Sequence, residues 1–160
     1  MDRPGIPSRS FTRLLGLAAM PCLALTLASC TGEQPKTYRL GETIQIGEFQ
    51  LRPTHTETAA TQTAPGPGPK IRFVVFIRCT GGNRFNRMDL NREFFDRQAI
   101  ELVDERGRTY DFFSLGGGDT YSDWAAQFYV PADSRGLRLR LENIVWREGQ
   151  PKRVEVPLGQ

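Results

Sequence analysis

Side chains that bind soft metals or act as nucleophiles are scarce in this 160-residue chain. It has one histidine, three cysteines and three methionines. Structural zinc sites use sets of four cysteine and histidine ligands, and copper sites draw on histidine, cysteine and methionine. We therefore expect no metal site and no cofactor. A thiol–imidazole pair would have to join Cys79 to His55, and no neighbouring residue supports such a pair.

The chain also lacks a hydrophobic run long enough to span a membrane. Its most apolar stretch, residues 14–27, is interrupted by Pro21 and is shorter than the roughly 20 residues that a spanning helix needs. Three arginines precede this stretch, and the small residues Ala28 and Ser29 follow it. This order is typical of a secretory signal peptide, so we expect residues 1–29 to be removed.

The sequence Leu27-Ala28-Ser29-Cys30 resembles the lipobox of bacterial lipoproteins. The resemblance implies cleavage before Cys30 and lipidation of that residue. Each buried methylene contributes about 0.8 kcal/mol, so two or three acyl chains would hold the protein stably on a membrane. Thr31 is not the aspartate that often retains lipoproteins in the inner membrane. We expect a lipid-anchored protein of the cell envelope, with the outer membrane favoured in a cell that has two membranes.

The mature chain would be short and nearly neutral. Removal of the signal peptide leaves 131 residues, of which 30–38 are expected to be an acylated tether and 39–160 a single domain. The signal peptide carries three of the 21 basic residues and one of the 18 acidic residues, so the remaining net charge is +1. Net charge gives no reason to expect a polyanionic partner. Only Cys79 would keep a free thiol, which excludes an internal disulfide.

Residues 39–160 show the period-two alternation of β-strands. The strongest strand is expected at 70–79, where apolar side chains on both faces indicate a central position. At 137–141 leucines alternate with charged residues, which predicts one buried and one charged face. Asp104–Gly107 predicts a type I hairpin turn whose glycine is left-handed. The expected strands are 43–46, 49–58, 70–79, 98–103, 108–113, 124–130, 137–141 and 153–156. They predict an all-β fold, an antiparallel β-sandwich of about seven to eight strands without a long helix.

Three segments between the strands are expected to be loops. Residues 59–69 are rich in proline and glycine. Residues 83–96 mix apolar and charged side chains irregularly, which predicts a short helical turn or a crossover. Residues 116–123 begin with three glycines and include Asp119 and Asp123, but their spacing lacks the alternating ligands of a calcium loop. A plain flexible loop is predicted there.

Several segments together resemble the telokin-like, immunoglobulin-fold domain of uncharacterised bacterial lipoproteins and secreted antigens. The resemblance is carried by LGETIQIGEFQL at 40–51, RFVVFIR at 72–78, AIELVDERGRTY at 99–110, and FYVP at 128–131 followed by LRLRL. These stretches follow the order of the family across nearly the whole mature chain. The resemblance implies an immunoglobulin-like envelope domain with a binding or structural role and no established catalytic residues.

Candidate functional side chains are few. By alternation Cys79 falls on the inward face of its strand, which predicts a small buried side chain rather than a reactive thiol. His55 is expected to be an exposed strand residue. A partner-contact loop is predicted from five residues: Arg84, Phe85, Arg87, Phe94 and Trp124. Acidic neighbours balance the arginines of this region, so lipid headgroups or a protein are favoured there over nucleic acid, which is not expected as a partner.

We therefore expect a non-catalytic binding or structural module that meets a protein or glycan of the envelope. The first alternative is a small-ligand carrier, with an apolar pocket between the sheets lined by Phe73, Phe112 and Phe128. The second is a hydrolase of unrecognised type that uses Cys79 or the carboxylates of residues 116–123. An open cavity would favour the carrier, and carboxylates converging in a cleft would favour the hydrolase.

Overall fold

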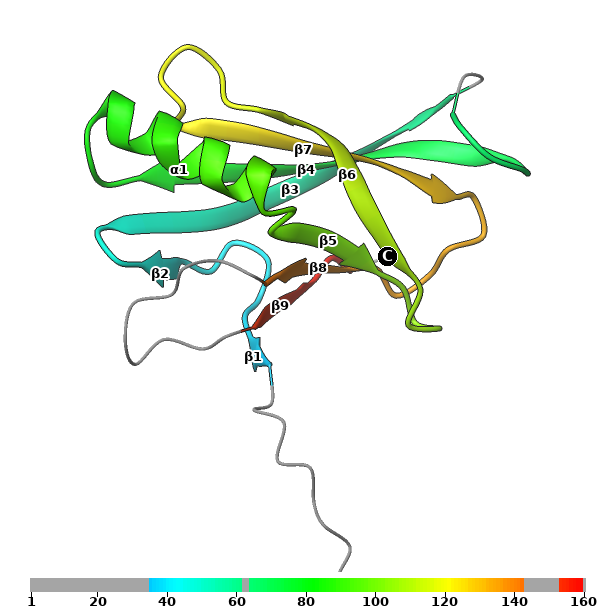
Figure 1. The fold of residues 1–160 in the computed structure, drawn as a ribbon. Coiled ribbons are helices and arrows are strands. Elements are labelled where there is room, and N and C mark those ends of the chain that lie inside the picture. The colour runs from blue at the N-terminus through cyan, green and yellow to red at the C-terminus, as the bar shows by residue number, and fades with distance from the viewer. Residues whose placement is uncertain (1–34, 62–63, 143–152, 160) are drawn as a thin grey trace, which may run out of the picture. The chain divides into compact units, whose positions relative to one another are not determined.

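The computed structural model describes residues 35–61, 64–142 and 153–159. All of them belong to a unit that spans Thr31–Gln160, and the predicted signal peptide and Cys30 lie outside the described residues. Nine strands and one helix occur within these ranges, so the predicted β class is confirmed (Figure 1). None of the described residues form a helix with the length and hydrophobicity needed to cross a membrane.

Eight of the nine strands coincide, to within a few residues, with predicted segments. The additional strand is the first, which falls in the predicted tether, residues 30–38. The strands are β1 (Lys36–Thr37), β2 (Ile44–Ile46), β3 (Phe49–Ala60), β4 (Lys70–Thr80), β5 (Ile100–Val103), β6 (Thr109–Gly116), β7 (Asp123–Pro131), β8 (Arg138–Leu141) and β9 (Val154–Pro157).

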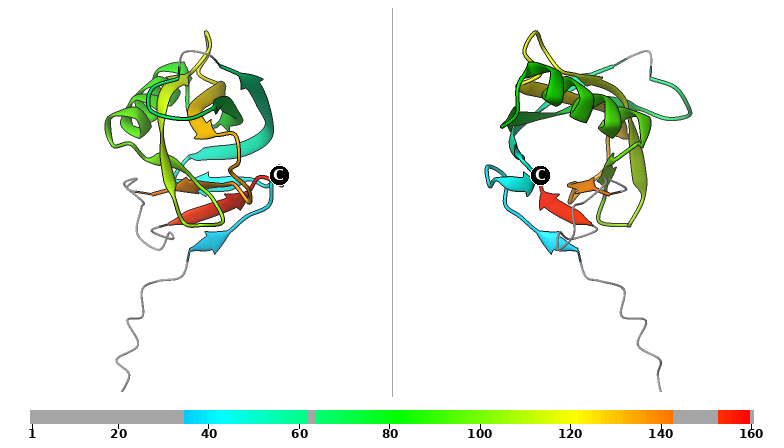
Figure 2. Two further views of the ribbon diagram at one scale, coloured as in Figure 1. Left: turned by 90° about the vertical axis from the view of Figure 1, so that its right-hand side faces the viewer. Right: turned by 60° about the vertical axis from the view of Figure 1, so that its left-hand side comes forward.

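The strands form one sheet in the order β1-β9-β8-β5-β6-β7-β4-β3-β2. The pair β1–β9 is parallel and the other pairs are antiparallel. β6 joins the two halves of the sheet, because Thr109–Asp111 pair with β5 whereas the residues from Phe112 onward pair with β7. A bulge between Phe112 and Ser114 marks this change of partner, as bulges bend a strand. The sequence predicted a sandwich, whereas the hydrogen bonds form one continuous sheet that curls (Figure 2).

A single hydrophobic core lies on the inner face of the sheet. Strand alternation places Phe73, Val75, Ile77 and Cys79 of β4 in this core, each at most 1% exposed. The leucines of residues 137–141 are buried and the intervening arginines are not, as predicted. The prediction that Cys79 is a small buried side chain is likewise confirmed.

The largest departure from the expected fold is α1 (Arg84–Asp96), a 13-residue helix in place of the irregular segment 83–96. Its N-cap is Asn83, whose side-chain oxygen accepts a hydrogen bond from the backbone N–H of Asn86 at 3.0 Å. Such a cap satisfies one of the backbone donors that a helix start leaves free. An ion pair between Glu93 and Arg97, one turn apart, supports the other end.

Two faces of α1 carry apolar side chains, which explains why its sequence lacks a clear helical period. Leu90 and Phe94 lie one turn apart and pack into the core, while Phe85, Met88 and Phe95 are exposed. An amphipathic helix is recognised from a single apolar stripe. A second apolar stripe on the solvent side removes the contrast between an apolar and a polar face, so the sequence of this helix shows no clear helical period.

The predicted hairpin turn between β5 and β6 is confirmed and is built around a buried carboxylate. Gly107 has a φ of 77°, and its N–H donates to the carbonyl oxygen of Asp104. The Asp104 side chain accepts from the backbone N–H groups of Arg106 and Arg108, from Arg108 Nε and from the Tyr110 hydroxyl. Burial raises the pKa of Asp104, but these hydrogen bonds and the Arg108 charge outweigh it and lower the pKa to about 2.

Candidate functional site

The structure divides the five predicted contact residues between core and surface. Phe94 and Trp124 are fully buried, with ring centroids 5.3 Å apart in an edge-to-face contact. The indole N–H of Trp124 donates to the carbonyl of Tyr121 at 2.9 Å. The prediction that these two aromatic side chains form part of an exposed contact loop is therefore wrong. They are core residues because Phe94 follows Leu90 on the inner face of α1 and Trp124 alternates inward on β7.

Arg87 has a structural role instead of the predicted contact role. Its guanidinium donates to the carbonyls of Gly81 and Gly82 at 3.2 and 2.9 Å, and to that of Thr120 at 3.2 Å. It thereby ties the start of α1 to the loop before β7. Arg84 is exposed and Phe85 is 65% exposed, so two of the five predicted residues lie on the surface.

The candidate groups for hydrolysis do not form a reactive cluster. Cys79 is fully buried, and burial raises the pKa of its thiol to about 11 against a smaller opposing effect of Arg87, so the thiol stays protonated at neutral pH. Asp123 pairs with Arg78 at the surface, and Asp119 is exposed. Across the described ranges, no three histidine, cysteine or acidic side chains gather as metal ligands would.

Tight packing also fills the space where a carrier pocket was considered. Phe73, Phe112 and Phe128 are at most 4% exposed, and the rings of Phe112 and Phe128 meet edge to face with centroids 6.5 Å apart. These side chains are part of the core cluster and do not line a cavity of the kind that a carrier needs.

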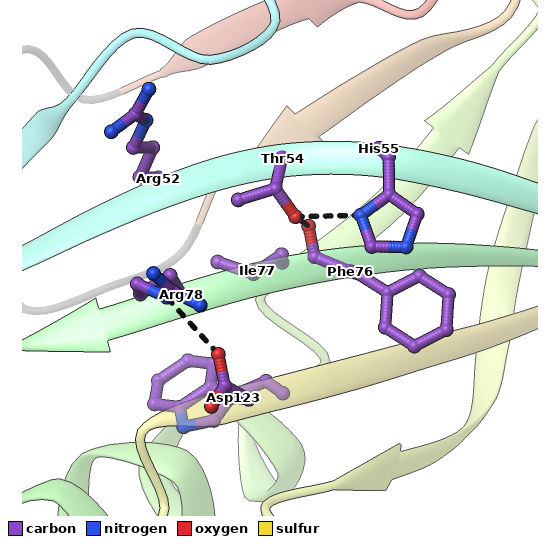
Figure 3. Close-up of a pocket in the computed structure, with 8 residues that line it drawn as sticks. Arg52, Thr54, His55, Phe76, Ile77, Arg78 and Asp123 are labelled. Carbon is purple, nitrogen blue, oxygen red and sulfur yellow. Dashed lines mark hydrogen bonds and ion pairs between the residues drawn. The ribbon is translucent and has the colours of Figure 1, made fainter.

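A solvent-open pocket of about 460 Å³ lies instead on the sheet, across β3, β4 and β7 (Figure 3). Its lining combines cationic, polar and aromatic side chains from the three strands: Arg52, Thr54, His55, Phe76, Ile77, Arg78, Asp123 and Trp124. Most of the polar members point away from the core, because they alternate with the buried residues of their strands. We refer to this site as the outer pocket.

One row of the outer pocket carries three charges on neighbouring strands. Arg52 lies directly opposite Arg78, and Arg78 lies directly opposite Asp123. Arg78 Nε is 3.2 Å from Asp123 Oδ1, whereas the side chain of Arg52 has no acidic partner among the described residues. Like charges directly opposite each other destabilise a sheet. The row therefore carries an excess positive charge. The repulsion between the two arginines destabilises the sheet, and a bound anion would offset that repulsion.

A bulge in β3 supplies the aromatic end of the outer pocket. The register shifts between Pro53 and His55, and Thr54 is the inserted residue. The Thr54 hydroxyl donates to the carbonyl of Phe76 at 3.2 Å and lies 3.0 Å from His55 Nδ1. The imidazole stacks on the Phe76 ring with centroids 4.3 Å apart. His55 is exposed, as predicted.

These groups suit recognition of an anion attached to a flat or apolar unit. Guanidinium groups bind carboxylate and phosphate through paired hydrogen bonds, and the Arg52 side chain makes no hydrogen bond or ion pair with the described residues. This site was not predicted from the sequence because Arg52 and Arg78 are 26 positions apart. Only the strand register brings them together, and the near balance of basic and acidic residues conceals a local excess of positive charge. The Pro53 bulge was the one available signal, since proline within a strand indicates an edge or a bulge.

Comparisons with known proteins place few constraints on the chain. No protein-family model matches it, and no curated protein matches its sequence. Among solved structures, it is similar to the secreted protein MPT63 of Mycobacterium tuberculosis, with 12% sequence identity and a TM-score of 0.45. That match covers 78% of this chain and 98% of the MPT63 chain.

Proposed function

We propose that this protein is a lipid-anchored cell-envelope protein whose β domain binds an acidic glycan without cleaving it. The observation that carries the proposal is the cross-strand pair Arg52 and Arg78 in the outer pocket, with one carboxylate for two guanidinium groups. A carboxylate or phosphate of the glycan would take the place of the missing partner of Arg52.

The surface beyond the outer pocket suits a polymer. Tyr129 lies on the same strand as Ala125, the cross-strand neighbour of Phe76, and the four-residue separation corresponds to about 13 Å along β7. Phe113 stacks on Tyr129 with ring centroids 4.2 Å apart, and Phe113 is 44% exposed. Two aromatic pairs thus flank one face of the sheet. Such platforms suit sugar rings, whereas the outer pocket supplies the charge.

The lipid anchor and the finer fold are parts of the same proposal. The lipobox-like sequence ending at Cys30 supports export and acylation. An immunoglobulin-like, telokin-like sandwich is supported by the two halves of the sheet, which share β6 and enclose one core. The protonated, buried thiol of Cys79 and the pairing of Asp123 with Arg78 favour binding over turnover. A carrier pocket is disfavoured by the packed phenylalanines.

Calorimetric titration with oligogalacturonate tests the proposal, with the methyl-esterified oligomer as an uncharged probe of the same backbone. We expect binding of the acidic oligomer only, weakened by salt. Arg52→Ala should lower the affinity about 10-fold or more, because a charge-assisted bond is lost. Glycerol-phosphate oligomers show whether phosphate substitutes for carboxylate.

Arg84→Ala is the matched control, because Arg84 is an exposed arginine of α1 that lies outside the outer pocket and on a different element from Tyr129. Equal binding of charged and esterified oligomers, or equal losses in Arg52→Ala and Arg84→Ala, would contradict glycan recognition through this pocket. Chromatography of the recovered oligomer tests turnover, since shortened products would show that the protein is an enzyme.

A further inference from the structure

A second cavity of about 320 Å³ lies between the solvent side of α1 and the loop that precedes β7. Its lining is one residue of that loop, Tyr121, and five residues of the helix: Met88, Asp89, Asn91, Arg92 and Phe95. None of them belongs to the outer pocket. We call this cavity the helix groove.

Asn91 is the unusual member of the helix groove. It is only 7% exposed, yet its amide nitrogen Nδ2 has no hydrogen-bond partner in the described structure. Buried polar groups are nearly always paired, and an exception calls for a ligand or another explanation. A donor that is unpaired in the free protein is suited to a carbonyl oxygen that arrives with a partner.

The other side chains that line the helix groove indicate which further chemical groups a partner needs. Met88 and Phe95 are 36% and 46% exposed on one helix face, and Phe85 extends this apolar surface. Arg92 pairs with Asp96 at 3.6 Å, whereas Asp89 has no ion pair in the described part of the chain. The groove therefore presents an apolar contact, a hydrogen-bond donor and an unpaired negative charge.

The opposite wall is held in place before any partner binds. Tyr121 has a positive φ of 54°, and its carbonyl accepts from the Trp124 indole. The neighbouring Gly117 leaves room for the Tyr121 ring, since a Cβ on this glycine would lie 2.2 Å from a ring carbon. The bond from Arg87 to the Thr120 carbonyl fixes the same loop to α1. A preformed wall reduces the ordering cost of binding.

We propose that the helix groove binds an extended peptide segment of a partner protein. The Asn91 amide, which solvent does not reach in the free protein, turns into the groove and donates from Nδ2 to a main-chain carbonyl of the segment. An apolar side chain packs between Met88 and Phe95, and a neighbouring lysine or arginine pairs with Asp89. An acyl chain offers neither an acceptor for Asn91 nor a charge for Asp89. A glycan lacks the apolar side chain, so a peptide fits the three features together.

An array of seven-residue peptides with a central leucine–lysine pair tests this inference on the mature protein. Matched peptides carry leucine–glutamate or serine–lysine at the centre. We expect the leucine–lysine peptides to bind, with at least a 5-fold preference over both matched sets. Binding to none of the peptides, or equal binding to the three sets, would overturn the proposal. So would binding to phosphatidylglycerol vesicles that matches or exceeds peptide binding.

Asn91→Leu separates a recognition role from a structural one. Leucine has a similar size but no buried unpaired donor, so the free variant should have an equal or higher Tm. Its affinity for the peptides should fall about 5-fold. A variant that is less stable and binds peptide normally would refute the role of Asn91. Arg84→Ala, outside the groove, should bind as the wild type does, and oligogalacturonate binding should be unchanged in Asn91→Leu.

Discussion

Asp104 shows how one fully buried carboxylate can organise a hairpin. Its two oxygens accept four hydrogen bonds, from Arg106, Arg108 and Tyr110, and Tyr110 also lies 3.3 Å from the Ser134 hydroxyl. These hydrogen-bond donors stabilise the ionised form of the Asp104 carboxylate. The turn and the return strand therefore depend on the charge of a residue that solvent does not reach.

Replacing Asp104 with asparagine should lower the unfolding free energy by about 1–3 kcal/mol at pH 7, since an amide cannot satisfy the same donors. The pKa of Asp104 is about 2 in the folded protein, below its ordinary value of 3.8. Its contribution is thus complete above pH 4 and is lost as the pH falls from about 4 to 2. Urea unfolding at pH 7, 4 and 2.5 measures the unfolding free energy of the wild type and the variant. The difference in unfolding free energy between the two proteins should be smallest at pH 2.5. A difference that stays constant over this pH range would contradict a contribution from the ionised Asp104.

Phe94 and Phe85 give a direct comparison of a buried and an exposed aromatic on one helix. Phe94→Ala should cost about 3–5 kcal/mol of unfolding free energy, because it empties a core site. Phe85→Ala should change stability by no more than about 0.5 kcal/mol, because the side chain is 65% exposed. Denaturant unfolding measures both. Similar values for the two variants would show that Phe94 is not a core residue.

Individual residues were predictable where strand alternation decides the environment, as for Cys79 and for the leucines at 137–141. Phe94 was not, because the prediction of an irregular segment does not say which side chains face the core. Trp124 begins the predicted strand 124–130, and its alternation with Ala126 and Phe128 was the available signal that it faces the core. Arg52 was missed for a different reason, since its significance comes from the residue opposite it on β4.

At the scale of elements, α1 is held by contacts that its own periodicity does not reveal. The cap at Asn83, the inner pair Leu90 and Phe94, and the Arg87 bonds to three carbonyls fix it on the sheet. Short helices are marginal in isolation and obtain most of their stability from packing. The long strands, in contrast, can be recognised from the sequence, because alternate residues of β4 from Phe73 to Cys79 are buried.

Arg87→Met should keep the aliphatic packing of the side chain and lose its hydrogen bonds. We expect an unfolding free energy lower by about 1–2 kcal/mol and faster amide exchange in the loop 117–122, which Arg87 contacts at Thr120. Hydrogen-exchange mass spectrometry measures the amide exchange rate in this loop directly. Arg84→Met is the control on the same helix, and exchange that is equally fast in both variants would exclude a specific clamp.

At the scale of the whole molecule, we propose that residue 30 determines the position of the chain in the cell. Cys30→Ser should move the protein from the membrane fraction to the soluble fraction, because serine cannot form the thioether to diacylglycerol. Fractionation with mass spectrometry of the mature N-terminus measures this. A wild-type N-terminus without added lipid mass, or a variant that still sediments with membranes, would refute the anchor.

The sequence was sufficient to predict eight of the nine strands but not the order of strands in the sheet. Period-two alternation is local, whereas β4 pairs with β7, β5 with β8 and β1 with β9. Such pairings join segments whose separation in sequence carries no signal in a single chain. The outer pocket spans β3, β4 and β7, so it depends on the same non-local information.

The parallel pair β1–β9 also determines how the domain would respond to mechanical load. Lys36 and Tyr38 donate main-chain hydrogen bonds to Arg153 and Glu155, so a pull from the direction of Cys30 reaches β9 through a contact only two strand residues long. This contact should detach before the core is strained, and each residue released adds up to about 3.4 Å of reach. If Cys30 anchors the protein as we propose, release of the first strand would lengthen the tether and let the two proposed binding sites move away from the membrane while the rest of the fold stays intact.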